Sequence, residues 1–224
     1  MTVNNATMFR TAVALAASAF MTTVLAAPAQ AQETANVTTW SQAATFLGGT
    51  GSLWEPKYTA KKKLNGGISV VKDTYPGDGT SENPPQLATS AGALYGTNKS
   101  GFRIMEKFAD SQWAAEPAPS WQEAPVGSGK VRITLGDPGT QITVNATVSA
   151  NCYQPKFKVN IPEQPKGFQC AQADVKKYGG VLEMTAKPPS TMTAPGNTTI
   201  RIESNGLTYQ QLLKIAGSLQ QFIG

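Results

Sequence analysis

The sequence predicts an α+β fold in which an antiparallel β-sheet is packed by a C-terminal amphipathic helix, with a loop-rich N-terminal half and one disulfide. Three observations predict it. Apolar and polar residues alternate over residues 131–148, apolar residues recur at helical spacing after residue 208, and the chain holds two cysteines. Alternation places apolar side chains on one face of a strand, and a helix with one apolar side needs a surface to cover.

The N-terminal segment has the pattern of a secretory signal peptide. Arg10 precedes an apolar, Ala-rich run over residues 11–27, and Pro28 breaks that run. Ala29 and Ala31 then supply the small residues of a cleavage site. The run is shorter than the roughly 20 residues that span a bilayer, which favours a cleaved peptide over a retained anchor.

We therefore expect cleavage between Ala31 and Gln32 and a secreted or cell-envelope location. Residues 32–224 then form a single secreted domain, with loops prevailing over 32–128 and a hairpin, sheet and terminal helix over 129–224. No second long apolar stretch follows, so no transmembrane segment is expected after cleavage.

The charge balance is mildly basic, with 19 Lys and Arg against 14 Asp and Glu and a net charge of +5. The basic residues are dispersed along the sequence, and their one run is Lys61-Lys62-Lys63. Such a run usually forms a solvated face, so nucleic acid is not an expected partner. Attraction to an anionic cell wall or lipid surface is an unspecific alternative.

Cys152 and Cys170 are predicted to form a disulfide, because paired cysteines outside the cytosol are usually oxidised. The chain has no histidine, so a zinc site would lack ligands and a cysteine nucleophile would lack its usual base. The bridge is expected to close an irregular connection that contains a short strand over residues 156–161. We expect neither a metal nor a cofactor.

The best predicted hairpin joins strands over residues 131–135 and 142–148 through a GDPG turn, and two further strands are expected over residues 179–188 and 197–204. After them, Thr208 and Gln211 have the spacing of a helical capping box. The helix is predicted to continue to Gly224 on an apolar stripe made of Leu212, Leu213, Ala216, Leu219 and Ile223.

The N-terminal half is predicted to hold a short helix that begins after Thr38 or Thr39 and ends at Gly48-Gly49. Strands are expected over residues 66–75 and 101–110. Residues 76–92 and 114–129 are rich in Gly, Pro, Ser and Ala and are expected to be loops. The second loop is alternatively a linker between two small domains, although one domain suits the length better.

The absence of histidine excludes the usual Ser-His-Asp and Cys-His arrangements and leaves Ser/Lys or carboxylate chemistry. Ser69 and Lys72, Ser81 and Asn83, and residues 99–101 follow the order of the penicillin-binding-protein motifs. That family needs its Ser and Lys one helical turn apart. Here they lie in a β-branched segment predicted to be a strand, which puts the two side chains on opposite faces.

Two other chemical patterns are weak. A glycosidase-type pair would need two carboxylates across a cleft. Glu55, which stands beside Trp54, and Glu106 are candidates. The commoner alternative is that each is an exposed surface acid. Residues 127–130, GSGK, lack the full phosphate-loop spacing and are expected to be a turn. We therefore predict no catalytic residue.

Three tryptophans are candidate binding residues: Trp54, Trp113 and Trp121 lie in or beside Pro/Gly-rich segments. A tryptophan on a loop can stack on a sugar or anchor a partner, but more often it fills the space beneath a long loop.

Two stretches carry a resemblance to known proteins. The segment AAPAQAQETA and the Thr/Gln/Gly-rich chain after it resemble uncharacterised exported proteins of mycolic-acid-containing actinobacteria. The ending TIRIESNGLTYQQLLKIAGSL resembles the strand–turn–helix that closes several bacterial exported proteins, including LolA-like carriers. LolA-like proteins have a curved antiparallel sheet that cradles acyl chains, so the resemblance implies lipid binding. It transfers no binding residue and offers no counterpart for the cysteine loop.

The sequence thus favours an exported cell-envelope or surface protein with a non-enzymatic binding or structural role. Its expected partner is a glycan, a lipid or a protein of the envelope. A histidine-free secreted hydrolase and a LolA-like lipid carrier are the two alternatives.

Overall fold

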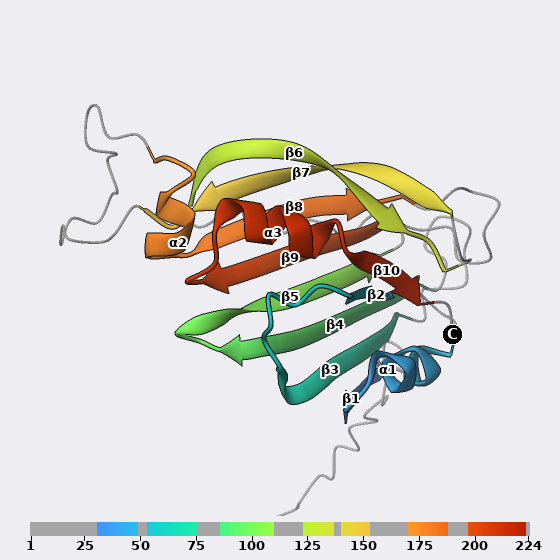
Figure 1. Ribbon diagram of the computed structural model, residues 1–224. Helices are drawn as coiled ribbons and strands as arrows, with labels where there is room; N and C mark the ends of the chain where they lie inside the picture. The colour runs from blue at the N-terminus through green and yellow to red at the C-terminus, as the bar shows by residue number, and fades with distance from the viewer. Residues whose placement is uncertain are drawn as a thin grey trace, which may run out of the picture.

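The computed structural model describes residues 31–48, 53–75, 86–109, 123–136, 140–152, 170–187 and 197–222. These residues form ten strands and three helices (Figure 1). The strands are β1 (Ala31–Val37), β2 (Leu53–Pro56), β3 (Leu64–Tyr75), β4 (Gln86–Thr97), β5 (Ser100–Ala109), β6 (Ala124–Thr134), β7 (Gln141–Ala150), β8 (Gly180–Ala186), β9 (Asn197–Asn205) and β10 (Leu219–Phe222). The helices are α1 (Trp40–Leu47), α2 (Asp174–Tyr178) and α3 (Tyr209–Ala216). The predicted β-rich fold is confirmed.

All ten strands belong to one sheet with the order β1-β3-β4-β5-β9-β8-β7-β6-β10-β2. The pairs are antiparallel except β10 with β6, which run parallel where Gln220 lies opposite Thr134. Figure 1 shows the sheet curving around α3, with β10 and β2 crossing its concave side. The last two strands in the order therefore cover the interior that the other eight enclose.

The concave side of the sheet holds the core, because alternate residues of most strands are buried there. In β9, Ile200 and Ile202 are fully buried, whereas Arg201 and Glu203, which alternate with them, point to the opposite side. The predicted hairpin is confirmed: Val131 pairs with Val144, and Ile133 pairs with Ile142. The strands predicted over 66–75, 101–110, 179–188 and 197–204 are β3, β5, β8 and β9.

Helix α1 has the predicted limits. Thr39 is the N-cap and forms a capping box with Gln42, so two backbone N–H groups of the first turn are bonded. Gly48 ends the helix in a left-handed conformation that glycine adopts without strain. Trp40, Ala43 and Leu47 are buried on the side that contacts β1 and β3.

The C-terminal helix begins as predicted but ends early. Thr208 and Gln211 form the expected capping box. The expected continuation of the helix through Leu219 to Gly224 is wrong within the described residues, because the helix stops at Ala216 and Leu219–Phe222 form β10. Pairing with β2 satisfies the backbone of this segment. Leu219 has the helical spacing of the apolar residues before it, but it lies in β10 and is buried as part of that strand.

Two predicted loops contain strands. In the first, Gln86–Thr97 form β4, which is paired along its length with β3 and β5. Its Ala, Ser and Gly residues have low strand propensity, and two neighbouring strands override that preference. In the second, β6 begins at Ala124, so the turn predicted over residues 127–130 is wrong.

The glycines of β6 explain why this segment looked like a turn. A Cβ on Gly127 would lie 2.8 Å from the Tyr209 hydroxyl oxygen, and one on Gly129 would lie 3.2 Å from a Leu213 methyl. Both atoms belong to residues of α3, so side chains on these two glycines would meet that helix. Glycine here serves packing instead of chain reversal.

The disulfide between Cys152 and Cys170 is present. It joins the residues that follow β7 to those that precede α2, across a sequence separation of 18. The strand predicted inside this loop, residues 156–161, lies outside the described residues.

Candidate functional site

The most unusual polar group of the interior is the carboxyl group of Glu106 in β5. Its register places it between Ala91 of β4 and Ile200 of β9, which are both buried apolar residues. Glu106 is 2% exposed. Burial raises the pKa of Glu106 well above its usual range, and a hydrogen bond from the backbone of Trp54 opposes that shift only in part. The neutral acid is therefore the favoured form.

Strand β2 lies over this carboxyl group. The backbone N–H of Trp54 donates to Oε2 of Glu106 over 2.9 Å, and the Trp54 side chain is fully buried. Two further polar atoms here are buried without a hydrogen-bond partner in the described structure: Oε1 of Glu106 and the indole Nε1 of Trp54. Native interiors seldom leave such atoms unpaired, so each one calls for an explanation.

An aromatic group lies on the same buried face of the sheet. Nε1 of Trp40 in α1 donates to the Tyr95 hydroxyl of β4 over 2.9 Å, and Tyr95 stacks on Phe102 with a centroid distance of 4.8 Å. Burial raises the pKa of Tyr95, the hydrogen bond from Trp40 lowers it, and the charges of Glu55 and Glu106 raise it.

We name the group formed by Glu106, Trp54, Tyr95 and Trp40 the interior polar site. Its members come from β5, β2, β4 and α1, and each is less than 8% exposed. Such a site offers hydrogen-bond donors and acceptors within an apolar wall. A neutral ligand group suits it, because a charged group would lose its hydration there.

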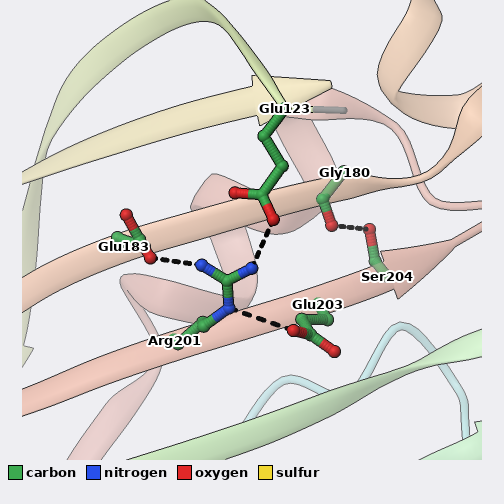
Figure 2. Close-up of polar contacts among 6 residues, drawn as sticks. All are labelled: Glu123, Gly180, Glu183, Arg201, Glu203 and Ser204. Atoms are coloured by element: carbon green, nitrogen blue, oxygen red, sulfur yellow. Dashed lines mark hydrogen bonds and ion pairs between the residues drawn. The ribbon is translucent and has the colours of Figure 1, made fainter. Parts of the chain in front are cut away.

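A second polar cluster lies on the other face of the sheet. Figure 2 shows Arg201 of β9 surrounded by three carboxylates. Its Nη2 contacts Glu123 at 2.5 Å, its Nε donates to Glu203 over 3.0 Å, and its Nη1 donates to Glu183. Every nitrogen of the guanidinium therefore has a partner.

Burial lowers the pKa of the Arg201 guanidinium, but hydrogen bonds to Glu123, Glu203 and Glu183 outweigh burial and raise it. The side chain of Glu123 is 5% exposed, whereas those of Glu183 and Glu203 are 40% exposed. This cluster holds Glu123, which directly precedes β6, against β9 in the middle of the sheet. Its carboxylates are engaged by the guanidinium, and the described residues contain no group of three or more acidic or cysteine side chains suited to a metal ion.

Comparison with protein-family models, with curated proteins and with solved structures finds no match to this chain. In the described part of the chain, no helix has the length and apolarity needed to cross a membrane.

The three tryptophans named from the sequence have different outcomes. Trp54 lies in β2 and is fully buried, so the expected loop position is wrong for it. Trp113 and Trp121 lie outside the described residues. The cleavage-site residues Ala31 and Gln32 lie at the start of β1, opposite Thr74 and Asp73 of β3, and Ala29 lies outside the described residues.

The remaining chemical candidates are not assembled into a site. Ser69 and Lys72 lie in β3, three residues apart, which confirms that a strand carries them. Ser81 and Asn83 lie outside the described residues. The carboxylate of Glu55 is paired with Lys57 and is 26% exposed, in contrast to the buried Glu106. The expectation that Glu106 is an exposed surface acid is wrong.

The Arg201 cluster was missed from the sequence, although a signal for half of it was present. In β9 the alternation of Ile200 and Ile202 with Arg201 and Glu203 puts both charges on one face. In β8, Glu183 likewise stands between buried residues, and it pairs with Arg201 in register. Glu123 could not be found this way, because it precedes β6, which lies three places from β9 in the sheet order.

Proposed function

We propose that this protein is an exported, non-enzymatic cell-envelope protein that binds a neutral amphipathic ligand inside its curved sheet. The ligand has an apolar body and a hydroxyl, ester or amide group. The observation that carries the proposal is the pair of buried, unpartnered polar atoms at the interior polar site, Oε1 of Glu106 and Nε1 of Trp54.

The chemistry of these two atoms defines the ligand group. A neutral carboxyl group both donates and accepts a hydrogen bond, and an indole N–H only donates. The oxygen of a ligand hydroxyl, ester or amide can accept a hydrogen bond from the indole N–H of Trp54. The carboxyl group of Glu106 can form a second hydrogen bond to the same ligand group. A cationic group is disfavoured, because it would have to ionise Glu106 in an apolar wall.

The surroundings define the rest of the ligand. Ala91, Ile104 and Ile200 are buried beside Glu106 on β4, β5 and β9. The amphipathic helix α3, which the sequence predicts to pack on the sheet, and the strands β10 and β2 close the concave side. A lipid with a neutral polar group fits this description, in line with the carrier function that the LolA-like resemblance implies.

Export is part of the same proposal. The signal-peptide pattern before Gln32 and the Cys152–Cys170 bridge support it, because disulfides persist in oxidising compartments. An open pair of catalytic carboxylates is less well supported, because Glu55 is bound to Lys57 while Glu106 lies buried under β2.

The test is native mass spectrometry of the protein purified from cells that export it, followed by organic extraction of whatever is bound. We expect a neutral amphipathic molecule with the native chain and a much lower occupancy with Glu106→Leu. Glu106→Gln retains both a donor and an acceptor and should keep the ligand. Glu33→Gln, an exposed acid of β1, is the matched control and should leave occupancy unchanged.

Two results would overturn the proposal. One is a ligand-free protein at high resolution with a single water bridging Glu106 and Trp54, since buried water is the ordinary partner of such atoms. The other is equal ligand occupancy in the native chain and Glu106→Leu.

A further inference from the structure

Six lysines that are scattered in the sequence gather at one end of the sheet. They lie on three segments: residues 59–64 between β2 and β3, residues 97–100 between β4 and β5, and residues 174–179 in and after α2. Figure 1 shows these segments at the same end of the molecule. The lysines of this basic end are Lys61, Lys62, Lys63, Lys99, Lys176 and Lys177.

The charge of this end is distinct from that of the remaining chain. Asp174 is the one acid within the three segments, and its Oδ2 accepts a hydrogen bond from the Ala171 backbone. The net charge of the three segments thus equals the +5 of the whole chain, so the rest of the sequence is balanced. The basic residues are dispersed along the sequence, as expected, but the six lysines of these described segments lie at one end of the sheet.

Hydrogen bonds hold the first two segments together. Nζ of Lys62 donates to the Ser100 hydroxyl over 2.9 Å, and the N–H of Gly96 donates to the Lys63 carbonyl oxygen over 2.8 Å. The β2–β3 segment and the β4–β5 turn therefore form one continuous surface.

The end of β9 connects the third segment to these two. The Asn205 amide donates to the Asn98 carbonyl oxygen over 2.8 Å. On its other side, a Cβ on Gly179, directly after α2, would lie 2.8 Å from the Asn205 side-chain oxygen. The lysines of α2 thus continue the same surface.

The backbone of the first segment is strained. Ala60 and Lys61 have φ angles of 52° and 61°, a left-handed conformation that costs a residue with a Cβ. The N–H of Lys62 donates to the Thr59 carbonyl oxygen over 2.9 Å and closes this turn. Glycine or asparagine normally occupies such positions. Retained strain at an exposed lysine is a common mark of a functional segment.

We propose that this basic end docks the protein onto an anionic lipid surface. All six cations are lysines, which act as hydrated point charges, whereas specific bidentate binding of a phosphate or carboxylate favours arginine. They are spread over three adjacent segments at the end of the sheet, which suits a flat, diffuse layer of negative charge. Tyr178, whose ring lies 4.6 Å from Nζ of Lys177, adds a residue suited to the interface of a bilayer.

The test is cosedimentation of the purified full chain with vesicles. One set contains about one third phosphatidylglycerol, and a second set is entirely phosphatidylcholine. The variant Lys61→Gln/Lys63→Gln/Lys99→Gln removes three charges from the basic end. The control Lys130→Gln/Arg132→Gln/Lys187→Gln removes three exposed charges elsewhere, and circular dichroism checks that both fold.

We expect binding to the anionic vesicles only, with at least about a tenfold loss in the first variant and less than about twofold in the control. Raising the salt from about 50 to about 300 mM should abolish the difference. Equal losses in the two variants, or no binding by the native chain, would overturn the proposal. So would binding to soluble polyphosphate without binding to vesicles, which would make the partner an anionic polymer.

Discussion

The backbone N–H of Trp54 and the Oε2 atom of Glu106 are 2.9 Å apart, although their strands are far from each other in the sheet order. β2 is the last strand of that order, and β5 lies on the opposite half. The bond exists because the sheet curls until its final strand lies across its own concave face. Glu106 is thereby enclosed on a side that an open sheet would leave accessible to water.

The pH dependence of stability should report on Glu106. Above the ordinary pKa of a glutamic acid, the unfolded chain releases this proton, while the folded chain keeps it because burial raises the pKa of Glu106. The folded state then binds more protons, so stability falls as the pH rises until the folded-state pKa is reached. Glu106→Gln should remove this loss. The free energy of unfolding of this variant should therefore rise relative to that of the native chain by up to about 1.4 kcal/mol per pH unit.

Urea unfolding at about pH 5 and about pH 8 measures this difference. Glu33→Gln, which replaces an exposed acid, should keep the pH dependence of the native chain. If Glu106→Gln and the native chain have parallel pH profiles, Glu106 is not the buried neutral acid described above.

Replacing Arg201 should destabilise the fold. Arg201→Ala leaves three carboxylates close together, of which Glu123 is nearly buried. We expect a loss of about 2 kcal/mol, below the value for a fully buried pair because Glu183 and Glu203 are 40% exposed. Arg201→Lys should recover only part of it, since lysine lacks the fork that contacts several carboxylates.

Arg103, exposed on β5 opposite Glu203, provides the control for that measurement. Arg103→Ala should change the free energy of unfolding by less than about 0.5 kcal/mol. Equal effects of the two substitutions would contradict the role assigned to the Arg201 cluster.

Helix α3 should contribute to stability through its apolar side. Leu212 is fully buried and lies 3.2 Å from the position of a Cβ on Gly180, so Leu212→Ala should cost about 2–4 kcal/mol. Gln210→Ala, on the exposed side of the same helix, should be nearly neutral. Thermal or urea unfolding of both variants distinguishes a helix packed on the sheet from one that is peripheral.

The disulfide should be present in the exported protein and should stabilise it. The mass should correspond to a chain that starts at Gln32 and lacks the two thiol hydrogens of Cys152 and Cys170. Reduction should lower the free energy of unfolding by about 3 kcal/mol, the chain-entropy value for a loop of this size. Free thiols in the secreted protein would contradict both the bridge and the compartment.

Sequence patterns predicted the structure correctly where it depends on residues close together in the sequence. The alternation around Val131 and Val144 predicted their hairpin. The candidate N-caps Thr38 and Thr39, and the capping box of Thr208 with Gln211, predicted where two helices begin. They failed for β4 and for the glycine-rich start of β6, where small residues resemble a loop. In both strands the neighbours decide the conformation: β3 and β5 pair with β4, and β7 pairs with β6, where side chains on Gly127 and Gly129 would meet Tyr209 and Leu213.

The candidate sites were only partly foreseeable. Glu106 stood in a predicted strand in the same alternating phase as Phe102 and Ile104, which indicates the buried face, but that period does not say which strand covers the carboxyl group. The lysines of the basic end come from three segments spread over more than 100 residues of sequence, and Glu123 reaches Arg201 across two intervening strands. Such contacts depend on the curvature and order of the whole sheet.

By itself the sequence determined the ends of α1 and the start of α3, the faces of most strands and the pairing of Cys152 with Cys170. Those features depend on residues within a few positions of one another, or on there being only two cysteines to pair. The tertiary structure alone decided that β10 and β2 cross the interior, that Glu106 is buried beneath Trp54, and that six lysines share one surface. The physical reason is that distant residues meet only after the sheet has closed, and side-chain periodicity carries no information about that closure.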